Sequence, residues 1–233
     1  MAVPFARQLK KGQHKVGGDV RAIQRTLKEL DIRKAPITGH YGKGTANQIK
    51  HFQAHHGLVA DGVYGYNTHG KFVKEMKHDS RLIYKAYIVQ RVAMLGVGYA
   101  PSIHYLQQRP MQDMAPWPNI PEYCDCSEFA TWTFKCAGFK DPNGLDYNGY
   151  GNTYTMVSEG RKVGSIRDAV PGRSLVFYGR TSWGAPTHVA IYVSHHQKLV
   201  FKRYAVVSHG SEGGPFFLDY RYRHDIHSIR VYE

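Results

Sequence analysis

Two of the three cysteines, Cys124 and Cys126, lie two positions apart in the stretch "YCDCSEFATW". Apolar residues recur at helical spacing from Cys126 to Cys136 and stop at Gly138, which predicts a helix that begins at about Cys126, after Asp125. A thiol in a first helical turn lies where backbone N–H groups converge and the helix dipole is positive. Both effects favour the thiolate and would lower the thiol pKa from about 8.5 toward neutrality, as a nucleophilic cysteine requires.

A cysteine nucleophile needs a general base, and the downstream segment offers a histidine. The apolar runs "SLVFYG" and "HVAIYV" predict two buried strands, and His188 begins the second. A histidine at a strand end can face a helix N-terminus. On its own it is weak evidence, because the chain has 14 histidines and a lone histidine is more often structural.

The C-x-C spacing could also bind a metal, with further ligands in "HHG", "HH" and "HDIH". Tetrahedral zinc sites, however, usually combine C-x₂₋₄-C with a second matched pair, which this sequence lacks. We therefore expect no metal and no organic cofactor. Three cysteines do not form a disulfide framework, and we expect Cys124 and Cys136 to be ordinary buried thiols.

The 233 residues carry a net charge of +13, spread along the chain. This excess suggests a polyanionic target such as nucleic acid, an anionic membrane or a bacterial wall polymer, although a basic protein can also be merely soluble. The N-terminal residues lack the apolar run of a signal peptide, and no stretch of 18 apolar residues could span a membrane. We therefore expect synthesis in the cytosol and no membrane insertion.

A short repeat organises the N-terminal part. "GHYGKGT" at residues 39–45 recurs as "GVYGYNT" at residues 62–68. The paired glycines suit tight turns with positive φ, and Thr45 and Thr68 suit helix N-caps. Helices are predicted over residues 19–30, with Asp19 as the cap, and after each threonine, with Gly57 ending the second.

These segments resemble the peptidoglycan-binding type 1 repeat domain found on many wall hydrolases. The matching residues are Val20, Ile23, Gln24, Gly39, Tyr41, Gly42, Thr45, Phe52, Gln53, Gly57, Leu58, Asp61, Gly62, Gly65 and Thr68. Thr38 departs from the family, which usually has aspartate there. The resemblance implies a small all-α, three-helix peptidoglycan-binding domain with an N-terminal arm, over residues 1–78.

An amphipathic helix over residues 82–95 is predicted to open a second domain, residues 79–233. There, "DCS", "PG..LVFY" and "HVAIYV" follow the order of the NlpC-type cysteine peptidases, which implies an α+β papain-like fold. "IHYLQQRPMQ", "DPNGLDYNGYGNTYTM" and "VVSHGSEGGP" resemble the branch carried by lysins of phages that infect actinobacteria. Glu128 replaces the usual glycine after "DCS", a departure tolerable on an exposed first turn.

The resemblance implies catalytic roles. Cys126 would be the nucleophile and His188 its general base. The family's third residue is a polar group, often histidine, on the following strand, where it orients the imidazole. By its place in the matching motif we expect His209, with His195 and His196 as competitors in the turn after the strand.

An oxyanion would be stabilised by the backbone N–H of Cys126 and, in relatives, by a tyrosine that precedes the nucleophile. Tyr105 in "IHYLQQ" best matches that position. Tyr99 is the alternative, and a tyrosine of the core remains a third interpretation.

Together these features predict a phage endolysin that cleaves stem-peptide amide bonds of peptidoglycan, with the D-γ-glutamyl–meso-diaminopimelate bond as the family's usual target. It would act as a monomer, without binding nucleic acid, and stay in the host cytoplasm until a holin opens the membrane. An N-acetylmuramoyl-L-alanine amidase could use the same triad. A non-catalytic basic protein that binds the wall or nucleic acid is the third alternative.

Overall fold

A computed structural model describes residues 3–13, 16–32, 36–112, 114–193, 204–210 and 213–233. It divides into two compact units, Ala2–Ile88 and Val89–Glu233. The division falls within one helix, α4 (His78–Gly98), so each unit contains half of it. The domain limits expected from the sequence, residues 1–78 and 79–233, stay a prediction.

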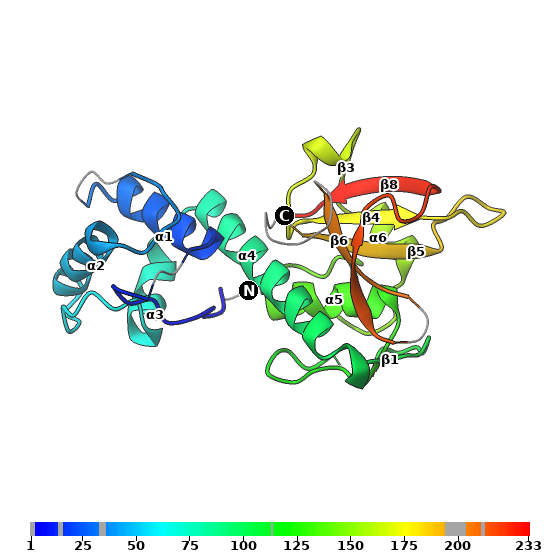
Figure 1. The fold of residues 1–233 in the computed structure, drawn as a ribbon, viewed down its shortest axis with the longest axis horizontal. Helices are drawn as coiled ribbons and strands as arrows, with labels where there is room; N and C mark the ends of the chain where they lie inside the picture. Colours follow the sequence, from blue (N-terminus) through cyan, green and yellow to red (C-terminus); the bar gives the residue numbers. More distant parts are fainter. Residues whose placement is uncertain (1–2, 14–15, 33–35, 113, 194–203, 211–212) are drawn as a thin grey trace. The chain divides into compact units, whose positions relative to one another are not determined.

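The N-terminal unit is helical. It contains α1 (Gly18–Glu29), α2 (Lys43–His55), α3 (Tyr66–Glu75) and the first half of α4 (Figure 1). Fully buried aliphatic and aromatic side chains form its core; they include Val20, Ile23, Leu27, Ile49, Phe52 and Phe72. Gly57, with φ 66°, follows the end of α2, as the sequence predicts. The expected three-helix module is confirmed.

In each copy of the repeat, a buried glutamine side chain forms hydrogen bonds with the glycine turn. In the first copy, the Gln24 side chain accepts from the backbone N–H of Gly39 (2.8 Å) and donates to the carbonyl of His40 (3.1 Å) and the hydroxyl of Thr45 (2.9 Å). The glutamine thus joins a helix to the turn that follows it and to the start of the next helix.

The second copy repeats this arrangement with Gln53. Its amide accepts from the N–H of Gly62 (2.8 Å) and donates to the carbonyl of Val63 (2.9 Å) and the hydroxyl of Thr68 (3.0 Å). Asp61 accepts a further bond from Gln53, at 2.9 Å. Gly62, with φ 74°, is in the left-handed region that favours glycine.

Thr38 performs the part that Asp61 plays in the second copy. Its hydroxyl accepts from the Gln24 amide (3.2 Å) and from the backbone N–H of His40 (3.1 Å). Asp61 accepts the equivalent two bonds from Gln53 and Val63. The hydrogen bonds around the two glutamines are therefore the same in both copies, although the first copy has Thr38 where the family usually has aspartate.

The predicted caps of the first three helices are wrong. Gly17, Gly42 and Gly65 are the N-cap residues. The predicted caps Thr45 and Thr68 are instead the third residues of α2 and α3, because their hydroxyls accept from the buried glutamines.

Asp19, predicted to cap α1, lies inside that helix. It is buried and accepts two hydrogen bonds from Arg7, at 2.7 and 3.0 Å. Gly42 and Gly65 have φ of −95° and −99°, so only the first glycine of each pair has the predicted positive φ.

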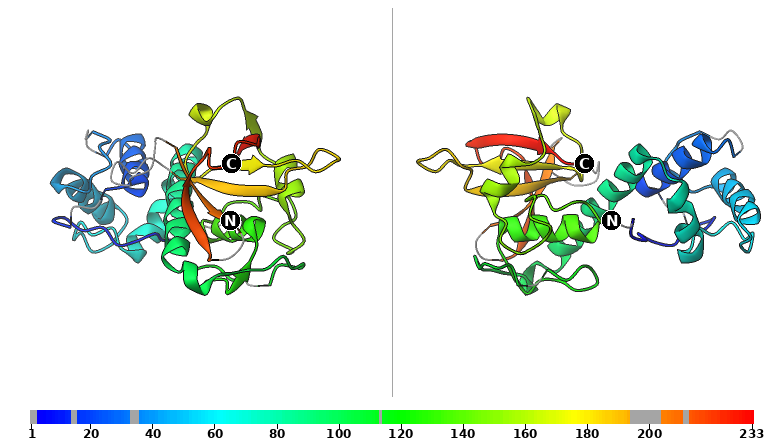
Figure 2. Two further views of the ribbon diagram at one scale, coloured as in Figure 1. Left: turned by 45° about the vertical axis from the view of Figure 1, so that its right-hand side comes forward. Right: turned by 180° about the vertical axis from the view of Figure 1, so that it is seen from behind.

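The C-terminal unit contains a six-stranded sheet in the order β3-β8-β4-β5-β6-β7, in which every neighbouring pair is antiparallel (Figures 1 and 2). Its strands are β3 (Arg161–Val163), β4 (Ser174–Tyr178), β5 (His188–Val193), β6 (Ala205–His209), β7 (Pro215–Asp219) and β8 (Ile226–Val231). The remaining elements are β1 (His104–Tyr105), β2 (Tyr123–Cys124), α5 (Cys126–Cys136), α6 (Thr153–Ser158) and two 3₁₀ turns, Ala100–Ser102 and Ile166–Asp168. The buried strands predicted from "SLVFYG" and "HVAIYV" are β4 and β5.

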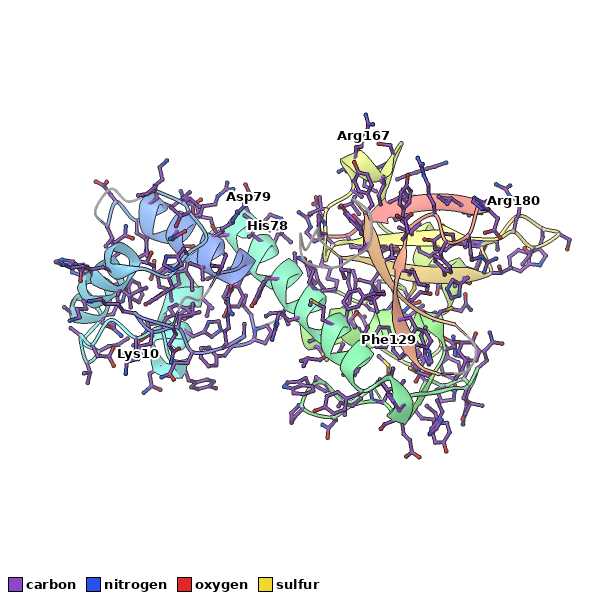
Figure 3. The ribbon with its side chains drawn as sticks, viewed as in Figure 1. Lys10, His78, Asp79, Phe129, Arg167 and Arg180 are labelled. Carbon is purple, nitrogen blue, oxygen red and sulfur yellow. The ribbon has the colours of Figure 1, made fainter. Side chains whose placement is uncertain are left out.

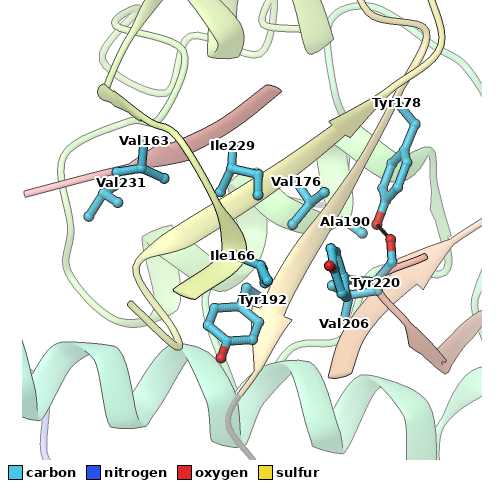
Figure 4. Close-up of a cluster of buried hydrophobic side chains, with 10 residues drawn as sticks. All are labelled: Val163, Ile166, Val176, Tyr178, Ala190, Tyr192, Val206, Tyr220, Ile229 and Val231. Carbon is cyan, nitrogen blue, oxygen red and sulfur yellow. Dashed lines mark hydrogen bonds between the residues drawn. The ribbon is translucent and has the colours of Figure 1, made fainter. Parts of the chain in front are cut away.

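The two faces of the sheet are both covered. One face carries a hydrophobic cluster that includes Val176, Ala190, Val206 and Ile229 (Figure 4). α5 packs against β5 and β6, and the ring of its Phe129, labelled in Figure 3, lies 6.2 Å from the ring of His209. Within the described residues, no helix combines the length and apolar character needed to cross a membrane.

Replacing the second buried glutamine tests its structural role. Gln53→Ala should lower the free energy of unfolding of the N-terminal unit by about 3 kcal/mol, because the Gly62 N–H loses its acceptor while buried. Hydrogen exchange of the Gly62 amide reports this locally and should accelerate. Gln13→Ala, at an exposed glutamine of the same unit, is the control. Unchanged protection of Gly62 in Gln53→Ala would contradict the assignment.

Candidate active site

α5 begins where the sequence predicts, at Cys126. Asp125 is its N-cap, and its carboxylate accepts from the backbone N–H of Glu128 (2.8 Å) and the hydroxyl of Ser127 (2.7 Å). Glu128 itself is buried rather than exposed, because nearly all of α5 is enclosed by the unit. Gly138, with φ 68°, follows the helix end, as predicted.

Arg109 holds the start of α5 in place. Its guanidinium donates to Asp125 (2.8 Å), to the Ser127 hydroxyl (2.8 Å) and to the carbonyl of Gly151 (2.6 Å). The Asp125 carboxylate is buried, so this pair has little competition from water. Arg109 was not expected from the sequence, because the motif "YLQQRP" gives no sign that its arginine contacts the start of α5.

The Cys126 thiol is buried, with only 4% of the residue exposed. Burial raises its pKa to about 12, and the charge of Asp125 acts in the same direction. The backbone N–H groups of Val189 and Ser127 and the charge of Arg109 oppose this change without overcoming it. The sequence expectation of a pKa lowered toward neutrality is therefore wrong for the free protein, since desolvation outweighs the helix N-terminus.

His188 is the first residue of β5 and is also buried. Burial, followed by the charge of Arg223, lowers its pKa to about 4, so the imidazole is neutral at pH 7. The Cys126 thiol lies near the backbone N–H of Val189, the residue after His188. The structure thus brings the helix start and the strand start together, although no direct hydrogen bond joins Cys126 to His188 in the described part of the chain.

The residue bonded to His188 is Ser208, not His209. The Nε2 atom of His188 lies 2.6 Å from the Ser208 hydroxyl, which in turn lies 3.0 Å from the Tyr222 hydroxyl. The reason is strand geometry, because consecutive residues of a strand point to opposite faces. β5 and β6 pair Ile191 with Val207, which puts Ser208 on the same face as Ala190 and His188.

His209 lies on the other face, toward α5. Its ring is 5.4 Å from the ring of Tyr105, and neither ring nitrogen has a hydrogen-bond partner among the described residues. Burial lowers its pKa; the backbone of His104 and of Gly214 is near enough to raise it in part, without reaching hydrogen-bond geometry. The competitors His195 and His196 lie outside the described residues. The alternation of side chains between the two faces of a strand is the sequence signal that distinguishes Ser208 from His209.

Tyr105, on β1, is half-buried beside Cys126. Burial raises its pKa, and the charge that Cys126 carries as a thiolate adds to this effect. Its hydroxyl accepts from the Gln107 amide (3.1 Å), which leaves the phenolic proton for another acceptor. Tyr99, the alternative, is exposed, and its ring lies 6.5 Å from that of Trp117.

The other two cysteines, Cys124 and Cys136, are buried thiols, as expected. Cys136 accepts a hydrogen bond from the backbone N–H of Trp117 (3.2 Å), and burial raises its pKa to about 11. Within the described residues, no group of three or more His, Cys, Asp or Glu side chains is placed to hold a metal ion.

This arrangement defines the available chemistry. The Cys126 thiol lies at the start of α5 near the backbone N–H of Val189, and His188 is the residue before Val189 on β5. Both side chains are neutral at pH 7, and the phenol of Tyr105 is close to the thiol. Such a pair can transfer the thiol proton to the imidazole as sulfur attacks an electrophile. An acyl group is the electrophile that the nearby donors would stabilise.

Comparisons with known proteins agree with the division of the chain. Residues 16–71 match the family described as "Putative peptidoglycan binding domain". The N-acetylmuramoyl-L-alanine amidase CwlL from Bacillus licheniformis is 42% identical over 67 residues, which cover 26% of this chain and only 19% of that amidase. The chain thus combines a helical domain of the peptidoglycan-binding type with an α+β domain, which confirms the expected order of an all-α domain and an α+β domain.

Two solved structures overlap part of the chain. NlpC1 from Trichomonas vaginalis has a TM-score of 0.43 at 16% identity, over 62% of this chain and 44% of its own. NlpC2 from the same organism has a TM-score of 0.42 at 17% identity, over 62% and 46%.

The pKa of Cys126 predicts how its reactivity depends on pH. Alkylation by iodoacetamide should keep accelerating from pH 7 to above pH 9, because the thiolate is scarce at neutral pH. Site-resolved mass spectrometry distinguishes Cys126 from Cys124 and Cys136, and glutathione gives the reference profile. A plateau between pH 5 and 8 would instead show a preformed thiolate–imidazolium pair and contradict this electrostatic description.

The pKa of His188 predicts acid sensitivity. Its native pKa of about 4 lies below its ordinary value of 6.5, so its contribution to stability is complete above pH 6.5 and is lost as pH falls toward 4. Between pH 7.5 and 5 this loss is about 2 kcal/mol. The three tryptophans all lie in the C-terminal unit, so urea unfolding followed by tryptophan fluorescence measures it.

His188→Gln should lose about 2 kcal/mol less than the wild type between these two pH values. His224→Gln, at an exposed histidine, should lose as much as the wild type. An equal loss in all three proteins would show that His188 titrates normally.

Proposed function

We propose that the chain is a peptidoglycan hydrolase in which Cys126 attacks a stem-peptide amide. The observation that carries this proposal is the position of a buried cysteine at the start of α5, against the start of β5, where His188 stands. The peptidoglycan-binding match over residues 16–71 supports bacterial wall as the ligand of the N-terminal unit. A net charge of +13 favours attraction to anionic wall polymers.

The reaction begins from the neutral pair. The thiol proton of Cys126 passes to Nδ1 of His188 as sulfur attacks the amide carbonyl, because Nε2 is already bonded. The oxyanion accepts hydrogen bonds from the backbone N–H of Cys126 and from the phenol of Tyr105. His188 then gives the proton to the leaving amine, and a thioester remains on sulfur.

Water completes the turnover. His188 removes a proton from the water as it attacks the thioester, and this proton returns to sulfur when the carboxylic acid product leaves; the acid then releases its own proton to solvent. The neutral resting state suits this cycle, since each proton stays between sulfur, imidazole, amine and water. No other reactant is consumed.

The bond we assign is D-γ-glutamyl–meso-diaminopimelate, supported by the resemblance of "DCS" and "HVAIYV" to NlpC-type peptidases. An N-acetylmuramoyl-L-alanine amidase is the second candidate, favoured by the similarity to CwlL. We further propose a monomeric phage endolysin that is held in the host cytoplasm until release by a holin. Its support is the likeness of "VVSHGSEGGP" to phage lysins.

Digestion of diaminopimelate-type peptidoglycan tests the function. The wild type should release peptides with new free amino groups on diaminopimelate, identified by mass spectrometry. Cys126→Ala should lose at least about 1,000-fold in rate, because no other group supplies the nucleophile. Cys136→Ala removes another buried thiol of α5 and is the matched control, with near wild-type rate.

Each other outcome has a defined meaning. Release of intact stem peptides would assign the amidase reaction and keep the nucleophile. Equal release by Cys126→Ala and wild type would refute the thiol mechanism. Binding to the wall without release by either protein would refute the hydrolase and leave the non-catalytic alternative.

A further inference from the structure

We infer that Ser208 and Tyr222 together form the positioning group for His188, in place of the polar side chain, often histidine, that relatives use. Ser208 lies on β6, the strand after the one that carries His188. The direction of the hydrogen bonds and the kinetic consequence rest on the proposed function, whereas the contacts of the imidazole do not.

The contacts of the Ser208 hydroxyl define a chain of three groups. The hydroxyl is 2.6 Å from Nε2 of His188 and 3.0 Å from the hydroxyl of Tyr222. Ser208 is 2% exposed and His188 8% exposed, so neither bond competes freely with water. The His188 and Tyr222 rings, 6.4 Å apart, stand edge to face across this hydroxyl.

The direction of the bonds follows from what each group can donate. A base that accepts the thiol proton on Nδ1 must carry its resting proton on Nε2. Nε2 then donates to the Ser208 oxygen, and the Ser208 proton points to the Tyr222 oxygen. Because Nε2–H is present in both the neutral and the protonated imidazole, this bond persists throughout the proton transfer.

The opposite direction would disable the base. If Ser208 donated to Nε2, the resting proton would be on Nδ1, and the nitrogen toward the thiol could not accept another. In the direction that we infer, the Tyr222 oxygen accepts the Ser208 proton, which leaves Ser208 with no proton to donate to Nε2. An uncharged serine can therefore set the tautomer of the imidazole, provided that a second hydroxyl group fixes the direction of the serine O–H.

Burial lowers the pKa of His188 and keeps the imidazole neutral at pH 7, and the charges around these three groups do not overcome this effect. Arg223 acts against a positive imidazole, whereas Asp125 and Asp225 act in its favour. His209, on the opposite face of β6, acts weakly against it. Ser208 adds no charge to this balance, so it orients the ring without raising its pKa as a carboxylate would.

The test measures the His188 tautomer in the full-length protein by nitrogen-15 NMR of labelled histidines at pH 7, with His188→Gln used to assign the signal. The wild type should show the Nε2–H form. In Ser208→Ala the tautomers should mix or shift toward Nδ1–H, and in Tyr222→Phe the change should be smaller. Ser208→Thr keeps the hydroxyl and should restore the wild-type signal.

Two matched variants separate this role from simple packing. Ser174→Ala removes a buried serine of β4 whose hydroxyl accepts from the Val170 N–H (2.8 Å), away from His188, and should leave the tautomer unchanged. His209→Asn alters the sequence-based candidate and should also leave it unchanged. An Nδ1–H form in the wild type, or a change caused by His209→Asn and not by Ser208→Ala, would overturn the inference.

Kinetics on soluble muropeptides adds a functional readout. Ser208→Ala should lower kcat roughly 10- to 100-fold with KM changed by less than about 2-fold, because the base is misdirected and substrate contacts are kept. Ser208→Thr should recover most of kcat. If the wild type is inactive but His188 has the expected tautomer, the proposed hydrolase function is refuted and the positioning role of Ser208 is supported. If the wild type is active and Ser208→Ala has an unchanged kcat, the positioning role of Ser208 is refuted.

Discussion

The pairing of β5 with β6 is the constraint on which the candidate site depends. It aligns Ile191 with Val207, and this register decides which face of the sheet each later residue of β6 occupies. Ser208 therefore meets His188, while His209 meets the ring of Tyr105 on the side where α5 packs. A shift of one residue would exchange these two side chains and turn the valines of β6 to the wrong faces. The hydrophobic cluster around Val206 thus holds the register, and the register selects the group bonded to the imidazole (Figure 4).

Burial sets the protonation of the site more strongly than the helix N-terminus does. Cys126 occupies the position at which a helix dipole favours a thiolate, yet its pKa rises because the thiol is enclosed and Asp125 is adjacent. Asp125 is required there as the N-cap of α5, and Arg109 compensates its charge through a close ion pair. The same enclosure lowers the pKa of His188. The Cys126 thiol and the His188 imidazole are therefore both neutral at pH 7.

Much of the fold could be predicted because it follows from local patterns. The repeated glycine turns, the three short helices, the start of α5 and strands β4 and β5 all agree with periodicity and stop signals in the sequence. The caps could not be predicted in the same way. Thr45 and Thr68 have the side chains of good caps, but the buried amides of Gln24 and Gln53 recruit their hydroxyls. Tertiary hydrogen bonds thus override a local preference, and they also explain why Thr38 can replace an aspartate without loss of the network.

The candidate site could also be predicted only in part from the sequence, because tertiary contacts decide much of its chemistry. Cys126 and His188 could be proposed from residue type and position, because a helix start and a strand start are visible in the sequence. Their environment could not, since pKa values depend on how much water the completed fold excludes. The choice between Ser208 and His209 depends on strand register, and similarity to a motif favours the residue with the more familiar chemistry. A histidine is the more familiar partner for an imidazole, but geometry gives that position to a serine backed by a tyrosine. A short polar side chain that points to the right face can orient a base better than a titratable one that points away from it.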